Sequence, residues 1–201
     1  MKTSTLLSIC LVVSFVIGSI IDIYFIKKRK KLTKELNDLL FNKQFKEYDD
    51  LLANNTMYFK AFNLQMLRLQ KEMATNNYAE VVEICKKTNE AKLNENQSIM
   101  INNIAFNYFM SNNHYTDAKK ALDHLVIYKD KNIYKECLML YEIFVEKTYK
   151  YIEKLESELN EVDDVKKSRY LFLLSEMYKN KNDIKTASEY LNKYQKEANL
   201  N

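Results

Sequence analysis

The feature that most constrains the fold is the near absence of residues that break helices. The 201-residue chain contains one glycine, Gly18, and no proline. Hairpins and barrel corners of β-proteins depend on glycine, and phosphate-binding loops need several glycines within one short segment. These counts argue against an all-β fold and exclude a P-loop and a dinucleotide-binding fingerprint. A chain without proline can form helix after helix, with turns made by Asn and Asp, so the sequence predicts an all-α fold.

The segment from Leu6 to Ile26 is apolar and contains no Lys or Arg. As a helix it would extend roughly 30 Å, the thickness of the hydrocarbon core of a bilayer. Five basic residues follow it directly: Lys27, Lys28, Arg29, Lys30 and Lys31. A basic flank stays in the cytoplasm, so residues 1–31 are interpreted as a single-pass plasma-membrane anchor with its N-terminus outside. A cleaved signal peptide is the alternative, but its apolar region is shorter and its basic flank comes first.

Asp22 lies near the end of this segment, and small residues precede it at intervals of four, Ser14 and Gly18 among them. Such spacing lets two membrane helices approach, which predicts a possible homo-oligomer. The favoured alternative is that Asp22 reaches the neighbouring lysines or lipid headgroups. The net charge of +4 comes entirely from residues 1–34, because the rest of the chain carries slightly more acidic than basic groups. Nucleic acid is therefore not an expected partner.

Beyond residue 31 the apolar pattern repeats. Five pairs of residues with the same spacing mark the start of a second helix: Phe45 and Tyr48, Tyr78 and Val81, Tyr115 and Ala118, Tyr149 and Ile152, Ile184 and Ala187. The intervals between successive pairs are 33, 37, 34 and 35 residues. The clearest unit combines large, small and aromatic residues in two short helices: Leu174, Ser175 and Tyr178, then Ile184, Ala187, Leu191 and Tyr194.

This unit and its period resemble the tetratricopeptide (TPR) repeat. The resemblance implies a TPR-like α-solenoid of about five helical hairpins over residues 32–198, because one hairpin cannot bury its apolar face alone. Ten helices are expected, at 31–42, 44–54, 57–74, 78–89, 95–111, 115–127, 132–146, 148–160, 165–180 and 184–198. The first of them either continues the membrane helix or bends away from it. Helix-capping side chains are expected at Asn54-Asn55-Thr56, Asn94 with Gln97, Asp130 and Asp163-Asp164.

No pattern of catalytic or metal-binding residues is present, so neither an enzyme nor a cofactor is expected. Cys10, Cys85 and Cys137 have no CxxC spacing. The two histidines, His114 and His124, are ten residues apart, and neither Asp117 nor Asp123 lies three or four residues from His124, so no chelating pair with it is formed. Acidic residues between 153 and 158 are interpreted as part of a solvated face.

In TPR arrays the first helix of each repeat lines a concave groove that holds a peptide or helix. The resemblance implies that the following residues bind a partner protein: Asn102, Asn103, Phe106, Tyr134, Leu138, Tyr141, Phe144, Arg169, Phe172 and Glu176. The aromatic residues among them suit an apolar peptide or amphipathic helix, or they pack between neighbouring repeats. The expected function is a membrane-anchored scaffold or adaptor on the cytoplasmic face. The alternatives are a peptide-binding sensor or regulator, and an outward-facing, chaperone-like subunit of a secretion apparatus.

Overall fold

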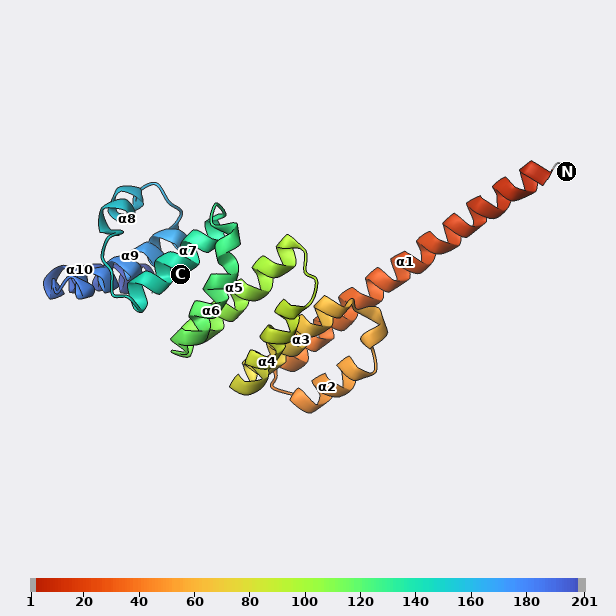
Figure 1. Ribbon diagram of the computed structural model, residues 1–201, viewed down its shortest axis with the longest axis horizontal. Coiled ribbons are helices and arrows are strands. Elements are labelled where there is room, and N and C mark those ends of the chain that lie inside the picture. Colours follow the sequence, from red (N-terminus) through yellow and green to blue (C-terminus); the bar gives the residue numbers. More distant parts are fainter. Residues whose placement is uncertain (1–2, 199–201) are drawn as a thin grey trace. The chain divides into compact units, whose positions relative to one another are not determined.

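The computed structural model describes the backbone of residues 3–198 and the side chains of residues 22–197. Within these residues every regular element is a helix (Figure 1), which confirms the all-α prediction. The elements are α1 (Thr3–Phe41), α2 (Phe45–Ala53), η1 (Thr56–Tyr58), α3 (Ala61–Ala74), α4 (Tyr78–Glu90), α5 (Glu95–Ser111), α6 (Tyr115–Leu125), η2 (Val126–Tyr128), α7 (Asn132–Phe144), α8 (Ile152–Glu158), α9 (Asp164–Asn180) and α10 (Ile184–Ala198).

Most predicted helix boundaries agree with these to within two residues. Two predicted helices differ more. The one expected at 57–74 is split into the 3-10 turn η1 and the helix α3, and the one expected at 148–160 shrinks to the seven residues of α8. Of the two possibilities for the first helix, continuation is observed, since α1 runs unbroken from Thr3 to Phe41 (Figure 1).

No helix in the described part of the chain is long and apolar enough to cross a membrane. Most of the predicted span, Leu6–Ile26, lies outside the residues whose side chains are described, which begin at Asp22.

The contacts between residues divide the chain into two units, unit 1 (residues 1–91) and unit 2 (residues 92–201). Unit 1 contains the hairpins α1–α2 and α3–α4. Leu32 and Leu36, one helical turn apart on α1, are buried against Tyr48 of α2 and Leu67 of α3. The Tyr48 hydroxyl donates a hydrogen bond of 2.7 Å to the backbone carbonyl of Leu67, which fastens the second hairpin to the first.

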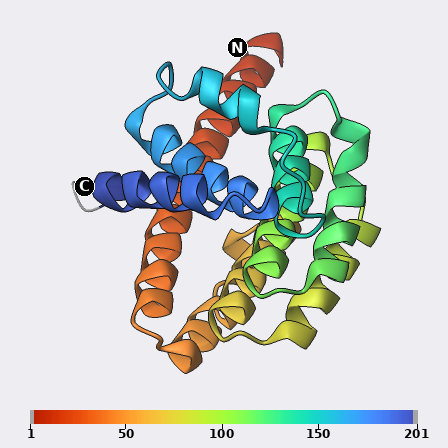
Figure 2. The same cartoon turned by 90° about the vertical axis from the view of Figure 1, so that its left-hand side faces the viewer.

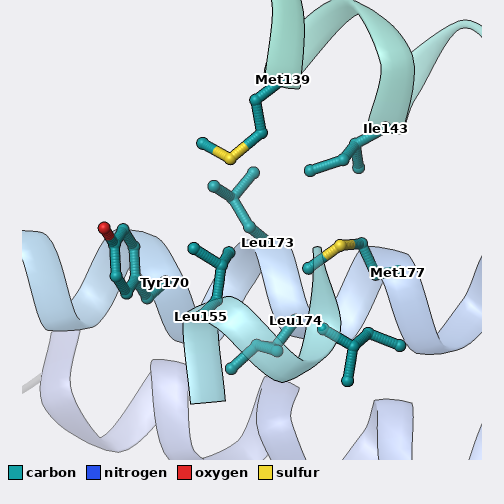
Figure 3. Packing of buried hydrophobic residues seen from close by; sticks show 8 residues of the cluster. Met139, Ile143, Leu155, Tyr170, Leu173, Leu174 and Met177 are labelled. Atoms are coloured by element: carbon teal, nitrogen blue, oxygen red, sulfur yellow. The ribbon is translucent and has the colours of Figure 1, made fainter. Parts of the chain in front are cut away.

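Unit 2 contains three successive hairpins, α5–α6, α7–α8 and α9–α10. The helices α5 and α6 lie side by side (green in Figure 2). The first helices α5, α7 and α9 contact one another in that order, as in the repeats of an α-solenoid. Met139 and Ile143 of α7 point toward Leu173 of α9, and Leu155 brings α8 into the same core (Figure 3). These apolar contacts hold the short helix α8 in place.

The turn inside each hairpin repeats the same backbone conformation. A residue with positive φ lies at Lys43, Asn76, Asn113, Lys147 and Asn182. These positions are separated by the intervals of 33, 37, 34 and 35 residues predicted from the side-chain pattern. In four of the turns the last two amide groups bond back to the helix in the Schellman arrangement, for example Lys43 to Leu40 and Gln44 to Leu39. The backbone therefore confirms the predicted period of the hairpins.

Helix capping is confirmed at two of the four predicted places. Asn94 and Gln97 form a reciprocal capping box at the start of α5, and Asp163 accepts from the amide of Lys166 at the start of α9. The prediction is wrong at Asp130, because α7 begins after Lys131 without a side-chain cap. It is also wrong at Asn54-Asn55-Thr56, where the Asn55 amide donates backward to the carbonyl of Leu51.

Candidate functional site

All ten predicted partner-binding residues lie in unit 2, on the adjacent helices α5, α7 and α9. The α5 residues differ from the others in burial. Phe106 is 0% exposed and Asn102 is 1% exposed, so neither offers its side chain to a partner. Asn103 is half-buried, and its side-chain oxygen accepts from the Cys137 thiol at 3.4 Å. The α5 part of the predicted groove is thus built into the protein interior.

The α7 and α9 residues remain accessible in part. Tyr134, Leu138, Tyr141, Phe144 and Phe172 are all half-buried. The rings of Phe144 and Phe172 stack with centroids 6.1 Å apart, and Phe172 also contacts Tyr194 of α10 at 5.4 Å. These aromatic side chains join neighbouring hairpins, as the alternative interpretation expected, and still expose part of their surface.

The two charged residues of the predicted site make ion pairs. Arg169 of α9 bonds to Glu136 of α7 across 3.0 Å, which ties the two first helices together. Glu176 pairs with Lys179 one turn further along α9, at 2.5 Å. Since both pairs are partly exposed, each contributes little to stability. They fix side-chain positions at the edge of the aromatic surface.

A pocket of about 370 Å³, which the sequence did not predict, lies between α7, α8 and α9. Its floor is apolar, formed by the buried side chains of Met139, Leu155 and Tyr170. Its remaining lining residues are mostly charged or polar: Asn132, Lys135, Glu136, Leu138, Tyr151, Lys154, Glu158, Lys166 and Arg169. An apolar floor with convergent polar groups is the usual composition of a ligand pocket.

The pocket carries an excess of positive charge. Arg169 neutralises Glu136, and Glu158 accepts a hydrogen bond of 2.8 Å from the Tyr170 hydroxyl. Burial and the neighbouring Glu158 carboxylate both raise the pKa of Tyr170, so its phenol stays protonated as a donor. Lys135 and Lys154 have no carboxylate partner among the described residues. The pocket is lined by four basic and two acidic side chains, so its net charge is positive.

Of the acidic residues of α8 that the sequence placed on a solvated face, Glu153 is exposed, but Glu156 and Glu158 are half-buried. Glu156 accepts two hydrogen bonds on one oxygen, from Tyr178 at 2.8 Å and from Tyr190 at 2.7 Å. The two tyrosine rings stack, with centroids 5.5 Å apart and planes 13° from parallel. Burial, followed by the Glu156 hydrogen bond, raises the pKa of Tyr178 to about 12 and also raises that of Tyr190. Glu156 thus joins α8 to both helices of the last hairpin.

The two described cysteines are buried thiols. Burial raises the pKa of Cys85 to about 12 and that of Cys137 to about 11, so both are protonated near neutral pH and poor nucleophiles. Among the residues that the structure describes, no three His, Cys, Asp or Glu side chains are placed to hold a metal ion.

Comparison with known protein families, with curated proteins and with solved structures finds no match to this chain.

Proposed function

We propose that this protein is a membrane-anchored scaffold or adaptor that binds a partner protein on the accessible surface of α7 and α9. The observation that carries the proposal is the set of half-buried aromatic residues on these two helices, which the Arg169–Glu136 ion pair ties together. Tyr and Phe side chains bury large areas at low entropic cost, which is why they predominate at the centres of interfaces. Helical hairpins stacked through their first helices supply the rigid backing.

The membrane anchor is supported by the last residues of the apolar segment. Ile23 and Tyr24 are more than half exposed and Ile26 is 48% exposed. Successive helix residues point about 100° apart, so these side chains cover more than one side of α1. A helix that is apolar on several sides needs a surrounding apolar medium. A bilayer provides that medium, and Lys27 to Lys31 favour the cytoplasmic orientation.

Site-specific photo-cross-linking in native cells tests the adaptor surface. A photoreactive residue replacing Tyr141 or Phe172 should yield a discrete cross-linked product. A residue replacing Val165, which is 83% exposed on α9 and outside the aromatic set, is the matched control and should yield none. Equal yields of cross-linked product from the test positions and from Val165 would disprove the proposal. Phe106→Ala is unsuitable as a test because emptying a fully buried site costs about 3–5 kcal/mol.

Topology distinguishes the adaptor from an outward-facing subunit of a secretion apparatus. A phosphatase reporter that is active only outside the cytoplasm, fused after Asn201, should be inactive. A reporter active only in the cytoplasm, fused at the same place, should be active. The reverse result would favour the outward-facing alternative.

The pocket between α7, α8 and α9 favours a second function, a sensor that binds an acidic peptide. A short fluorescent polyglutamate peptide serves as the probe. The double variant Lys135→Glu with Lys154→Glu should weaken binding about tenfold, since two charges beside the ligand change sign. Lys185→Glu with Lys193→Glu on the exposed face of α10 makes the same charge change away from the pocket. If both double variants weaken peptide binding equally, the peptide responds to the overall charge of the protein, and the sensor proposal is disproved.

A further inference from the structure

The 3-10 turn η1 is attached to α1 at the place where the apolar segment ends. The ring of Tyr58 lies 5.3 Å from that of Phe25. The Arg29 guanidinium donates a bond of 2.9 Å to the backbone carbonyl of Tyr58, and the Lys28 ammonium lies 5.9 Å from the centre of the Tyr58 ring. Phe25 precedes the end of the apolar segment at Ile26, and Arg29 lies in the basic run. The turn is therefore fixed at the boundary between the apolar segment and the basic run.

The middle residue of this turn, Met57, is 71% exposed. A flexible apolar side chain held this far into solvent gains little burial within unit 1. Its surroundings combine apolar and basic groups, because Ile23 and Ile26 are also exposed and Lys27 to Lys31 follow. Apolar side chains bordered by lysines are typical of surfaces that lie on anionic lipid.

We propose that η1 is a second membrane contact, in which Met57 enters the boundary between headgroups and acyl chains of an anionic bilayer. This inference rests on the membrane anchor proposed above. With Ile26 at the end of the span, the contacts of Tyr58 with Phe25 and Arg29 place its ring at headgroup depth, where tyrosine is enriched. Met57 is its direct neighbour and reaches the same layer. The turn would then fix the rotation of unit 1 against the membrane surface.

The chain offers a clean experiment because it contains no tryptophan. Three single-tryptophan variants of the full chain, Met57→Trp, Ile127→Trp and Phe15→Trp, are placed in vesicles of phosphatidylcholine and phosphatidylglycerol. Fluorescence quenching is measured with lipids brominated near the headgroup or near the chain end. Ile127 is the matched control, because it is the middle residue of the 3-10 turn η2 and is 73% exposed. Phe15 lies inside the proposed span and reports on the anchor.

The expected result is that shallow bromines quench Met57→Trp at least about twofold more strongly than Ile127→Trp. Deep bromines should quench Phe15→Trp. If Phe15→Trp is quenched but Met57→Trp behaves as Ile127→Trp does, the second contact is disproved and the anchor stands. If neither Met57→Trp nor Phe15→Trp is quenched, the anchor fails and the inference with it. Quenching of Met57→Trp alone would disprove the span, and with it the argument that sets Tyr58 and Met57 at headgroup depth.

Discussion

At the scale of single residues, the hairpin turns show how this chain folds almost without glycine. The left-handed position that ends a helix usually belongs to glycine, because a Cβ atom there crowds the following carbonyl group. Here three asparagines and two lysines hold it, at φ values between 53° and 65°. Asparagine tolerates this conformation through its short polar side chain, whereas lysine has no such compensation. The turns at Lys43 and Lys147 therefore carry avoidable backbone strain.

Lys43→Gly should increase the free energy of unfolding of unit 1 by about 0.5–1 kcal/mol, because the relief of strain exceeds the entropy that glycine adds to the unfolded chain. Urea unfolding followed by circular dichroism measures the change. Lys46→Gly is the matched control: the same substitution on the exposed face of α2 should lower stability by about 1 kcal/mol. Destabilisation by both variants would contradict the strain argument.

The two tyrosines on Glu156 make the stability of unit 2 sensitive to high pH. The pKa of Tyr178 is about 12 in the folded protein, against about 10 when unfolded. The raised pKa stabilises the fold fully below pH 10, and this contribution is lost as the pH rises toward 12. The melting temperature of the protein should therefore fall over this range. Tyr178→Phe with Tyr190→Phe should flatten the decline.

The same double variant also tests the hydrogen bonds at neutral pH. Glu156 would lose both donors while remaining half-buried, which should cost about 1–3 kcal/mol. Glu156→Gln keeps an acceptor for the tyrosines and should cost less. A double variant as stable as the wild type would show that water replaces the phenols without loss.

At the scale of helices, apolar periodicity predicted most boundaries because each helix buries one stripe of side chains. It failed at α8 and η1, where contacts distant in sequence decide the local structure. Tyrosines more than twenty residues away hold α8 through Glu156, and Tyr58 joins α1 through Arg29. The cationic pocket could not be predicted, since its lining residues come from α7, α8 and α9 and are brought together only by tertiary packing. Among the residues of the predicted groove, the full burial of Phe106 fits the alternative that the aromatics pack between repeats, whereas the aromatics of α7 and α9 stay half-buried.

Two aspartates that look equivalent in sequence should differ in their contribution to helix stability. Asp163→Ala removes the acceptor for the Lys166 amide at the start of α9 and should cost about 1 kcal/mol. Asp130→Ala precedes α7 but removes no cap, so its effect should stay within about 0.5 kcal/mol. Chemical unfolding of the two variants in parallel measures the difference. Equal losses would mean that helix-dipole charge, not the capping bond, carries the effect.

At the scale of the whole molecule, each unit combines hairpins around its own apolar core, and unit 1 also contains the proposed anchor. Cell fractionation tests that anchor. The full chain should remain in the membrane pellet after alkaline carbonate extraction, because an apolar span is not removed by high pH or salt. A chain lacking residues 1–26 should appear in the soluble fraction with its helical content intact. If carbonate releases the full chain, the membrane span is disproved, and the protein is bound only to the membrane surface.

The unbroken course of α1 has a mechanical consequence. Its 39 residues form a rod of roughly 60 Å, and no proline or glycine lies between the proposed span and the leucines that hold α2 and α3. A rod without a hinge transmits torque. Lipid thickness or a neighbouring span can change the tilt of the proposed span. The first two hairpins would then rotate with α1 by the same angle.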